Sequence, residues 1–291
     1  MADIHNICRD ALLNDIIPFW FLLLLAISLA AGCATSPARS VVTPSGVIYR
    51  HLCRTQPRPL QIHVLRIDLR VVHSQLAVAM APDPDGEGEA ETVLVDPVEQ
   101  MNRSGMLAGI NANAWGMVPA PTAGKHQRFV AGGSANICGW VVDQGDERSP
   151  AKSGFWSFWM DEQGQPHIGN ISAAQPGPRL AVAGFSGLLK DGVVLSRPNE
   201  TLHPRTALGT DKSARMLTLV VVDGRQKGYS EGMSDYELAK LMRELGCHDA
   251  LNLDGGGSSV MVLRDANGLS VIVNRPSGGE PRPVPVLLGV R

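Results

Sequence analysis

The alternation of apolar and polar positions predicts that much of the chain forms β-strands. Residues 62–72 alternate well enough to give a strand one apolar face, and the near-continuous apolar run 216–222 predicts a buried strand. A hairpin is predicted over 184–195, turning at Asp191-Gly192. Further strands are predicted at 47–49, 106–110, 156–158, 260–263, 269–273 and 284–290, the last of these as hairpin and edge strands.

Two segments carry helix signals instead. Asp96-Pro97 suits a helix start, with Asp96 as N-cap, and the helix is predicted to run to about Arg103. Ser234 and Glu237 form a capping box before apolar residues at helical spacing, and Gly246 is the predicted C-cap. Together the patterns predict an α+β fold: a single domain with a mixed, largely antiparallel β-sheet core and a few packed helices.

The stretch Ala250–Leu263 departs from the simple strand pattern in its middle. Its flanks alternate, but between them stands Asp254-Gly-Gly-Gly-Ser-Ser259. One interpretation is a hairpin whose Asp254-Gly255 is a tight turn. The other is a functional loop in which glycines let a substrate approach main-chain N–H groups. Three glycines followed by two hydroxyls favour the loop, because a hairpin needs only one or two glycines.

Polar side chains follow three of the predicted strands. They are Asn111 and Asn113, Asp223 and Arg225, and Asn252 and Asp254, while Arg205, Arg275 and Arg282 lie in polar loops. Carboxylates grouped with arginines suit an anionic substrate and an acid/base step. Surface salt bridges are the alternative for each arginine.

Composition excludes several classes of function. The 291 residues are 44% hydrophobic and 19% charged, which is typical of a globular protein with one large domain or two small ones. A net charge of −2 without a basic cluster argues against nucleic-acid binding. The ATP-binding motif G-x-x-x-x-G-K-[ST] and the hydrolase motif G-x-S-x-G are absent. Cys53, Cys138 and Cys247 have no metal-site spacing, so no metal or cofactor is predicted.

The N-terminal region predicts export. The apolar run 16–31 has the length of a signal-peptide core and leads into Leu29-Ala-Ala-Gly-Cys33, which resembles a bacterial lipobox. We therefore predict a leader over 1–33, lipidation of Cys33, a flexible tether over 34–45, and a folded domain over 46–291. The protein would be an exported, membrane-anchored lipoprotein of the cell envelope. Arg9 is the only base before the run, so an uncleaved N-terminal membrane anchor is the alternative.

The segment Ala250–Ser259 resembles the signature of the phosphodiester glycosidase family. The resemblance extends through 205–209, 222–225, the helix from Ser234 and Asn274-Arg275-Pro276, and covers roughly residues 46–291. The family commonly has Asn-Gly-Gly before an aromatic residue where this chain has Asn111-Ala-Asn113-Ala-Trp115.

The resemblance implies hydrolysis of a sugar 1-phosphodiester at its glycosidic C–O bond. On that basis Asp254 handles the proton or water step or stabilises the cationic sugar centre, with Asp223 as its partner. Arg205, Arg225 and Arg275 hold the phosphate, Gly255 to Ser258 form an anion nest, and Asn111 and Asn252 bind sugar hydroxyls. The predicted substrate-binding residues are Asn111, Asn113, Arg205, Thr206, Arg225, Asn252, Gly255, Gly256, Gly257, Ser258, Ser259, Asn274 and Arg275.

The expected partners are a sugar phosphate or glycan, for which cell-surface polysaccharide phosphodiesters are the natural source, and the membrane at the N-terminus. Two alternatives stand beside an enzyme. One is a non-catalytic envelope protein that binds phosphorylated glycans or takes part in exopolysaccharide biosynthesis. The other is a structural lipoprotein.

Overall fold

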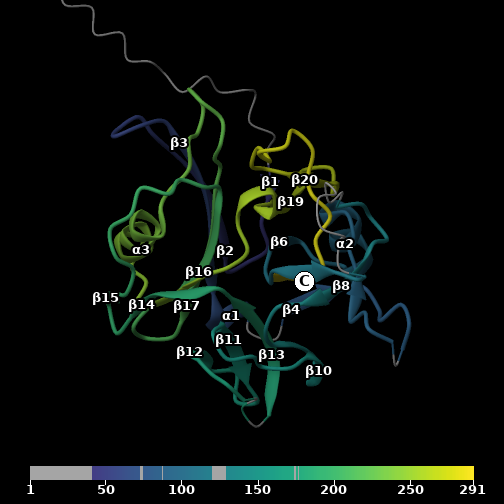
Figure 1. The fold of residues 1–291 in the computed structure, drawn as a ribbon. Coiled ribbons are helices and arrows are strands. Elements are labelled where there is room, and N and C mark those ends of the chain that lie inside the picture. The colour runs from purple at the N-terminus through teal and green to yellow at the C-terminus, as the bar shows by residue number, and fades with distance from the viewer. Residues whose placement is uncertain (1–40, 73–74, 87, 120–128, 174, 176) are drawn as a thin grey trace, which may run out of the picture. The chain divides into compact units, whose positions relative to one another are not determined.

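The structure is a computed structural model that describes residues 41–72, 75–86, 88–119, 129–173, 175 and 177–291. These residues lie within one compact unit, Ala38–Arg291. The described part of the chain contains 21 strands, three α-helices and one 3-10 turn (Figure 1). Every strand pairing in it is antiparallel.

The largest sheet has seven strands in the order β15-β14-β18-β16-β17-β3-β2. It contains the strand that leads into the glycine segment, with its neighbours on both sides. Its strands are β2 (Val47–Arg54), β3 (Leu60–Asp68), β14 (Ser186–Lys190), β15 (Val193–Val194), β16 (Arg205–Thr210), β17 (Met216–Val222) and β18 (Asp249–Asn252).

A six-stranded sheet receives the chain after the glycine segment. Its order is β1-β19-β6-β21-β4, and β20 pairs with β19 beside this path. Its strands are β1 (Val41–Val42), β4 (Leu76–Met80), β6 (Ala108–Asn111), β19 (Met261–Asp265), β20 (Ser270–Ile272) and β21 (Val286–Val290).

Two smaller sheets complete the strand structure. A five-stranded sheet has the order β10-β9-β13-β11-β12, and a three-stranded sheet the order β5-β8-β7. Their strands are β5 (Thr92–Val93), β7 (Trp115–Met117), β8 (Ser134–Ile137), β9 (Val141–Asp143), β10 (Asp146–Ser149), β11 (Trp156–Asp161), β12 (Pro166–Asn170) and β13 (Pro178–Gly184).

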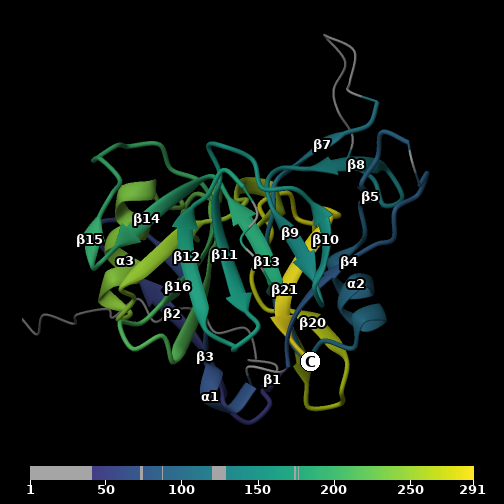
Figure 2. The same cartoon turned by 90° about the horizontal axis from the view of Figure 1, so that it is seen from below.

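The main core lies where the three larger sheets meet. Leu219 of the seven-stranded sheet, Ile110 and Leu288 of the six-stranded sheet and Phe158 of the five-stranded sheet belong to one buried cluster. Burial of these inward-facing apolar side chains removes apolar surface from water and so stabilises the fold. Figure 1 shows the strands β11, β12 and β13 below the two large sheets, and Figure 2, seen from below, shows them in front.

Helices cover the outer faces of the two large sheets. Helix α3 (Asp235–Glu244) packs Leu238, Leu241 and Met242 against the far side of the seven-stranded sheet. Helix α2 (Pro97–Ser104) packs against the six-stranded sheet through Met101. Both helices begin at their predicted caps.

The caps show why these segments are helical. The Asp96 carboxylate accepts hydrogen bonds from the N–H groups of Val98 and Glu99, and Gly105 ends α2 with φ of 70°. In α3 the capping box between Ser234 and Glu237 is complete. Leu245 is the C-cap of α3, and the predicted cap Gly246 follows it with φ of 89°.

The structure corrects several predictions. The predicted single domain with largely antiparallel strands and a few helices is confirmed. Strands dominate, however, so the fold is mostly β and α+β describes it only loosely, and the core is built from several antiparallel sheets rather than one mixed sheet. The predicted strand 62–72 ends at Asp68, and helix α1 (Leu69–Val72) follows. β21 is a central strand between β6 and β4 rather than an edge strand, which explains why all five of its residues are buried.

Part of the predicted tether belongs to a sheet, because Val41–Val42 pair with β19. The leader 1–33 and Cys33 lie outside the described residues. Among the residues that are described, the helices are too short or too polar to cross a membrane.

Gly289 tests how closely β21 and β6 pack. A Cβ at this position would lie 2.0 Å from the Ala108 carbonyl oxygen, which belongs to the backbone and cannot turn aside. We expect Gly289→Ala to lower the free energy of unfolding by about 3 kcal/mol, measured by urea denaturation. Gly116→Ala is the control, since no atom lies within 4 Å of its added Cβ. An equal loss in both variants would contradict the packing described here.

Candidate active site

The glycine segment crosses from one large sheet to the other. β18 before it pairs with β14 and β16, whereas β19 after it pairs with β1, β6 and β20. The two flanking strands therefore do not pair with each other, and the hairpin interpretation is wrong. Between them the chain makes a 3-10 turn over Gly256–Ser258.

Each glycine of this segment allows a close approach. Gly256 has φ of +63°, in the region that L side chains rarely adopt. A Cβ at Gly255 would lie 2.8 Å from the Pro204 carbonyl oxygen, and one at Gly257 would lie 2.3 Å from Nη2 of Arg282. The three glycines thus bring the start of β16 and an arginine against the backbone.

Asn111 holds the segment between the sheets. Its Nδ2 donates to the Asp254 carbonyl oxygen at 2.6 Å, and its Oδ1 accepts from Thr206 Oγ1 at 2.9 Å and from the Val260 N–H at 3.0 Å. Thr206 Oγ1 also lies 3.2 Å from Ser259 Oγ. Since Asn111 is 1% exposed and both ends of its amide have protein partners, it positions the loop. Its predicted contact with sugar hydroxyls stays a prediction.

A cavity of about 410 Å³ opens beside the segment. The structure brings seven of the predicted residues to its wall. It also adds residues that were not predicted to bind substrate, namely Arg282, His203, Phe129, Phe185 and Leu253. The described lining residues are Phe129, Phe185, His203, Arg205, Arg225, Asn252, Leu253, Asp254, Gly255, Gly256, Gly257 and Arg282.

Asp254 is the only acid among those lining residues. Burial raises the pKa of its carboxyl from the ordinary value of 3.8 to about 6, because a low-dielectric environment disfavours the charged form. Ser258, Arg282 and the Gly255 N–H act in the opposite direction but do not outweigh burial. A carboxyl that ionises near neutral pH is suited to proton transfer.

Two guanidinium groups lie on the glycine segment. Nη2 of Arg225 is 3.1 Å from His203 Nδ1 and would lie 3.3 Å from a Cβ at Gly256. Cζ of Arg282 lies 4.3 Å from the centre of the Phe129 ring. Burial lowers the pKa of Arg282, although Asp254 raises it. These cations border the cavity that contains Asp254.

Arg205 has a different environment from Arg225 and Arg282. Its Nε donates to the Met233 carbonyl oxygen at 2.8 Å, its Nη2 donates to that of Thr201 at 3.2 Å, and its Nη1 forms an ion pair with Asp235 at 2.5 Å. All three nitrogens therefore have partners within the protein. Arg205 therefore lines the cavity and also braces the loop before α3.

Asp223 does not line the cavity. The residue is 1% exposed. Its carboxylate accepts hydrogen bonds from Asn274 Nδ2 at 3.0 Å, from the Arg275 N–H at 3.0 Å and from Tyr229 Oη at 3.4 Å. His63 Nε2 lies 3.6 Å from it. These contacts make Asp223 a buried anchor, in contrast to its predicted role as the partner of Asp254.

The remaining predicted residues near Asp223 also support the backbone. Asn274 Oδ1 accepts from the Met261 N–H at 2.8 Å, and its Nδ2 donates to the Ser259 carbonyl oxygen at 3.1 Å. Cζ of Arg275 lies 5.0 Å from the centre of the Tyr229 ring, and Arg275 is absent from the residues that line the cavity.

Asn113 and Asn252 differ in their availability to a ligand. Asn113 Nδ2 donates to the carbonyl oxygens of Cys138 and Trp140, and its Oδ1 accepts from the Ala183 N–H. Asn252 Oδ1 is buried without a hydrogen-bond partner and lines the cavity. Because a buried polar atom without a partner is costly, Asn252 is suited to bind a ligand.

The predicted anion nest is only partly available. The N–H of Gly256 donates to Pro204, that of Ser258 to Gly255 and that of Ser259 to Gly256. Ser258 is buried beside Asp254, whose pKa its hydroxyl lowers. The main-chain N–H groups of Gly256, Ser258 and Ser259 are therefore already used within the protein.

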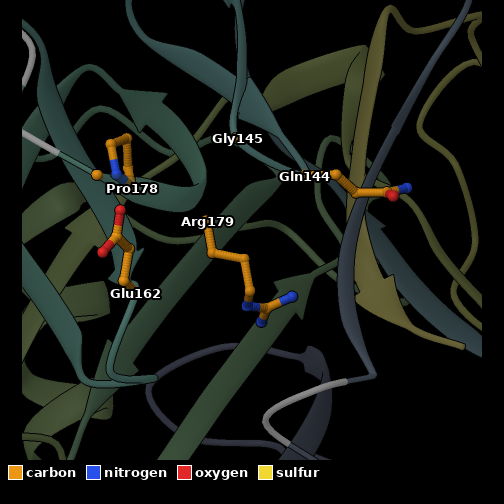
Figure 3. A pocket seen from close by; sticks show the side chains of 6 residues that line it. Gln144, Gly145, Glu162, Pro178 and Arg179 are labelled. Carbon is orange, nitrogen blue, oxygen red and sulfur yellow. The ribbon is translucent and has the colours of Figure 1, made fainter.

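Other clusters lie away from this cavity. A second cavity of about 420 Å³ lies at the five-stranded sheet, where Glu162, Pro178 and Arg179 surround an opening (Figure 3). None of the glycine-segment residues line it. Within the described residues, Asp191, His248 and Asp249 are the group with metal-ligand spacing, but Asp249 already binds Lys190 Nζ at 2.9 Å.

The anchor role of Asp223 is open to test by Asp223→Asn. This change replaces one carboxylate oxygen, which is an acceptor, with an NH2 group that faces donors. We therefore expect the free energy of unfolding to fall by about 3 kcal/mol in urea denaturation. The exposed Asp146→Asn is the matched control, with an expected change within about 0.5 kcal/mol. Equal stability of Asp223→Asn and the wild type would show that the anchor role is wrong.

Asp254→Asn is expected to stabilise the protein above pH 6. A pKa raised from 3.8 to about 6 means that folding favours the protonated carboxyl, so stability falls as pH rises between these values. At pH 8 the cost is about 3 kcal/mol, which the neutral amide removes. Thermal unfolding from pH 3 to 8 should show a higher melting temperature for the variant above pH 6 and no such gain below pH 4. An equal or lower value at pH 8 would contradict this account of the cavity.

Comparison with known proteins gives matches in both sequence and structure. A short sequence match, 44% identical over 57 residues, links the chain to an uncharacterised SPbeta prophage-derived protein of Bacillus subtilis (strain 168). The match spans 20% of this chain and only 8% of that protein.

Solved structures share the fold. The catalytic domain of zebrafish N-acetylglucosamine-1-phosphodiester alpha-N-acetylglucosaminidase, auto-inhibited by its pro-peptide, superposes with a TM-score of 0.59 at 19% identity, covering 87% of this chain and 86% of that one. A hypothetical protein from Synechocystis gives a TM-score of 0.59 at 14% identity, covering 89% of this chain and 64% of that one. The sequence model of the phosphodiester glycosidase family matches residues 120–291, more than half of the chain. The protein therefore belongs to the phosphodiester glycosidase family, a family of hydrolases.

Proposed function

We propose that the protein hydrolyses the glycosidic C–O bond of a sugar 1-phosphodiester and releases a free sugar and a phosphomonoester. The observation that carries the proposal is a cavity with one carboxyl, Asp254, beside the guanidinium groups of Arg225 and Arg282. Membership of the family supports the reaction class. In this proposal the substrate is a cell-surface or extracellular glycan, reached after export through the leader 1–33 and attachment at Cys33.

The chemistry of the leaving group explains why one carboxyl suffices. A phosphomonoester has a second pKa of about 6, so it is a weak base and a good leaving group. An alcohol has a pKa similar to that of water, about 16, and is a much poorer one. The phosphomonoester therefore departs as an anion without a proton donor. Arginine stabilises the charge that develops, because its planar fork matches phosphate oxygens. Arg225 and Arg282 fill this role.

Asp254 serves as the general base that removes a proton from the attacking water. Its pKa of about 6 leaves it ionised at neutral pH yet basic enough to accept a proton. The water oxygen forms a bond to the anomeric carbon while the bond from that carbon to the phosphate oxygen breaks. The proton moves to Asp254, and the electron pair leaves with the phosphate.

The proposal is tested with pairs of substrates that share a sugar. We expect turnover of methyl phosphodiesters of glucose and N-acetylglucosamine 1-phosphate and none of the corresponding methyl glycosides, because these lack an anionic leaving group. In labelled water the new oxygen should appear in the sugar. The value of kcat/KM should rise with pH until about 6 and then level off.

Variants separate an enzyme from a binding protein. Asp254→Asn should lower kcat by about 10²- to 10⁴-fold and still bind the phosphodiester. Arg282→Ala should lower kcat/KM, and Arg275→Ala, outside the cavity, is its matched control. Label in the phosphate would contradict cleavage of the C–O bond. Binding without turnover in the wild type would favour the non-catalytic envelope protein.

A further inference from the structure

The cavity has one aromatic residue that neither the fold nor the phosphate site requires. Phe185 lines the cavity and its side chain is 47% exposed. Among the described residues it is the only aromatic one in the set of exposed large hydrophobic side chains. Exposure of a phenyl ring to water is unfavourable, so a ligand that covers it gains binding energy.

Backbone contacts fix Phe185 beside Asn252. The Phe185 N–H donates to the Asn252 carbonyl oxygen at 2.8 Å, and Ser186 is paired with Asn252 across the sheet. A Cβ at Gly184 would lie 2.2 Å from the same carbonyl oxygen, so only glycine lets β13 come this close. Phe155 supports the ring, with centroids 6.3 Å apart.

Asn252 provides a second, independent observation at the same end of the cavity. The residue is 4% exposed, and its Oδ1 has no hydrogen-bond partner within the protein. Asn252 lines the cavity, and an amide oxygen without a partner is suited to accept a hydrogen bond from a hydroxyl group. An aromatic face next to such an acceptor matches a pyranose, which carries apolar C–H groups on its face and hydroxyls at its edge.

Along the chain, Asn252 lies on one side of Asp254, and the glycines next to the arginines lie on the other. The segment runs from Asn252 through Asp254 to Gly256 and Gly257, and Arg225 and Arg282 contact the last two. A substrate lying along the segment would place its sugar at Asn252, its anomeric carbon at Asp254 and its phosphate at the arginines.

From this arrangement we propose that Phe185 and Asn252 form the sugar-binding end of the cavity, with Phe185 stacked on the apolar face of a pyranose. The inference rests on the proposed function, because it gives a direction to the same substrate. It adds that affinity for the sugar depends on Phe185 while affinity for the phosphate does not. Phe185 is thus a specificity-determining residue.

Calorimetry with two kinds of probe tests the assignment. The probes are N-acetylglucosamine 1-phosphate, with glucose 1-phosphate as a second sugar, and methyl phosphate, which has no sugar. Phe185→Ala should weaken binding of a sugar 1-phosphate by about 3- to 10-fold and leave methyl phosphate binding unchanged. Phe185→Trp should retain sugar binding. Arg282→Ala should weaken both kinds of probe.

Leu269→Ala is the matched control, because that side chain is 62% exposed and does not line the cavity. It should bind every probe as the wild type does. Unchanged sugar 1-phosphate binding in Phe185→Ala, an equal loss for both kinds of probe, or no sugar 1-phosphate binding by the wild type would each overturn the inference.

The outcome is separable from that of the proposed function. If the probes behave as expected but no phosphodiester is hydrolysed, the sugar-binding end stands and the hydrolysis fails. If phosphodiesters are hydrolysed but Phe185→Ala leaves both sugar affinity and kcat/KM unchanged, the hydrolysis stands and the sugar-binding end fails.

Discussion

The buried amide of Asn111 is the link on which the site depends. It stands at the end of β6 in the six-stranded sheet and bonds to Thr206 of the seven-stranded sheet and to the carbonyl of Asp254 between them. The glycine crossover has few side chains of its own to hold it in place. Loss of one partner would leave buried groups unsatisfied, at about 1–3 kcal/mol each. The position of the reactive carboxyl is therefore a consequence of how two sheets are joined.

The same packing sets the electrostatics. In water, two neighbouring arginines would lower the pKa of a carboxyl, but here burial outweighs Arg282 and raises that of Asp254. The glycines admit those arginines because they lack Cβ atoms. Since several loop amides are already bonded to carbonyls, the positive charge comes from side chains that can adjust to a ligand. Burial of this carboxyl therefore costs stability at the pH values where it is ionised.

Local signals in the sequence predicted local structure well. The capping box at Ser234 and the apolar run 216–222 each place one element without reference to the rest of the chain. The pairing of strands that are far apart in the sequence could not be predicted from such local signals. The apolar run 284–290 reads equally well as an edge strand or a central one, and nothing near Arg282 or Phe185 in the sequence shows that they face the same cavity. Those contacts depend on which distant strands become neighbours.

Asp223-Gly224 and Asp254-Gly255 show the limit most clearly, because both are an acid and a glycine after a buried strand. The glycines share one cause: a Cβ at Gly224 would lie 2.5 Å from Pro204 N, and one at Gly255 would lie 2.8 Å from Pro204 O. Both strand ends thus pack against the start of β16, and the glycine carries no chemical information. The two acids differ in the groups that surround their carboxylates. Asp223 is surrounded by donors from the 274–275 segment and Tyr229, whereas Asp254 faces a cavity where burial outweighs its partners. The difference between the two acids therefore lies in their surroundings and not in their local sequence.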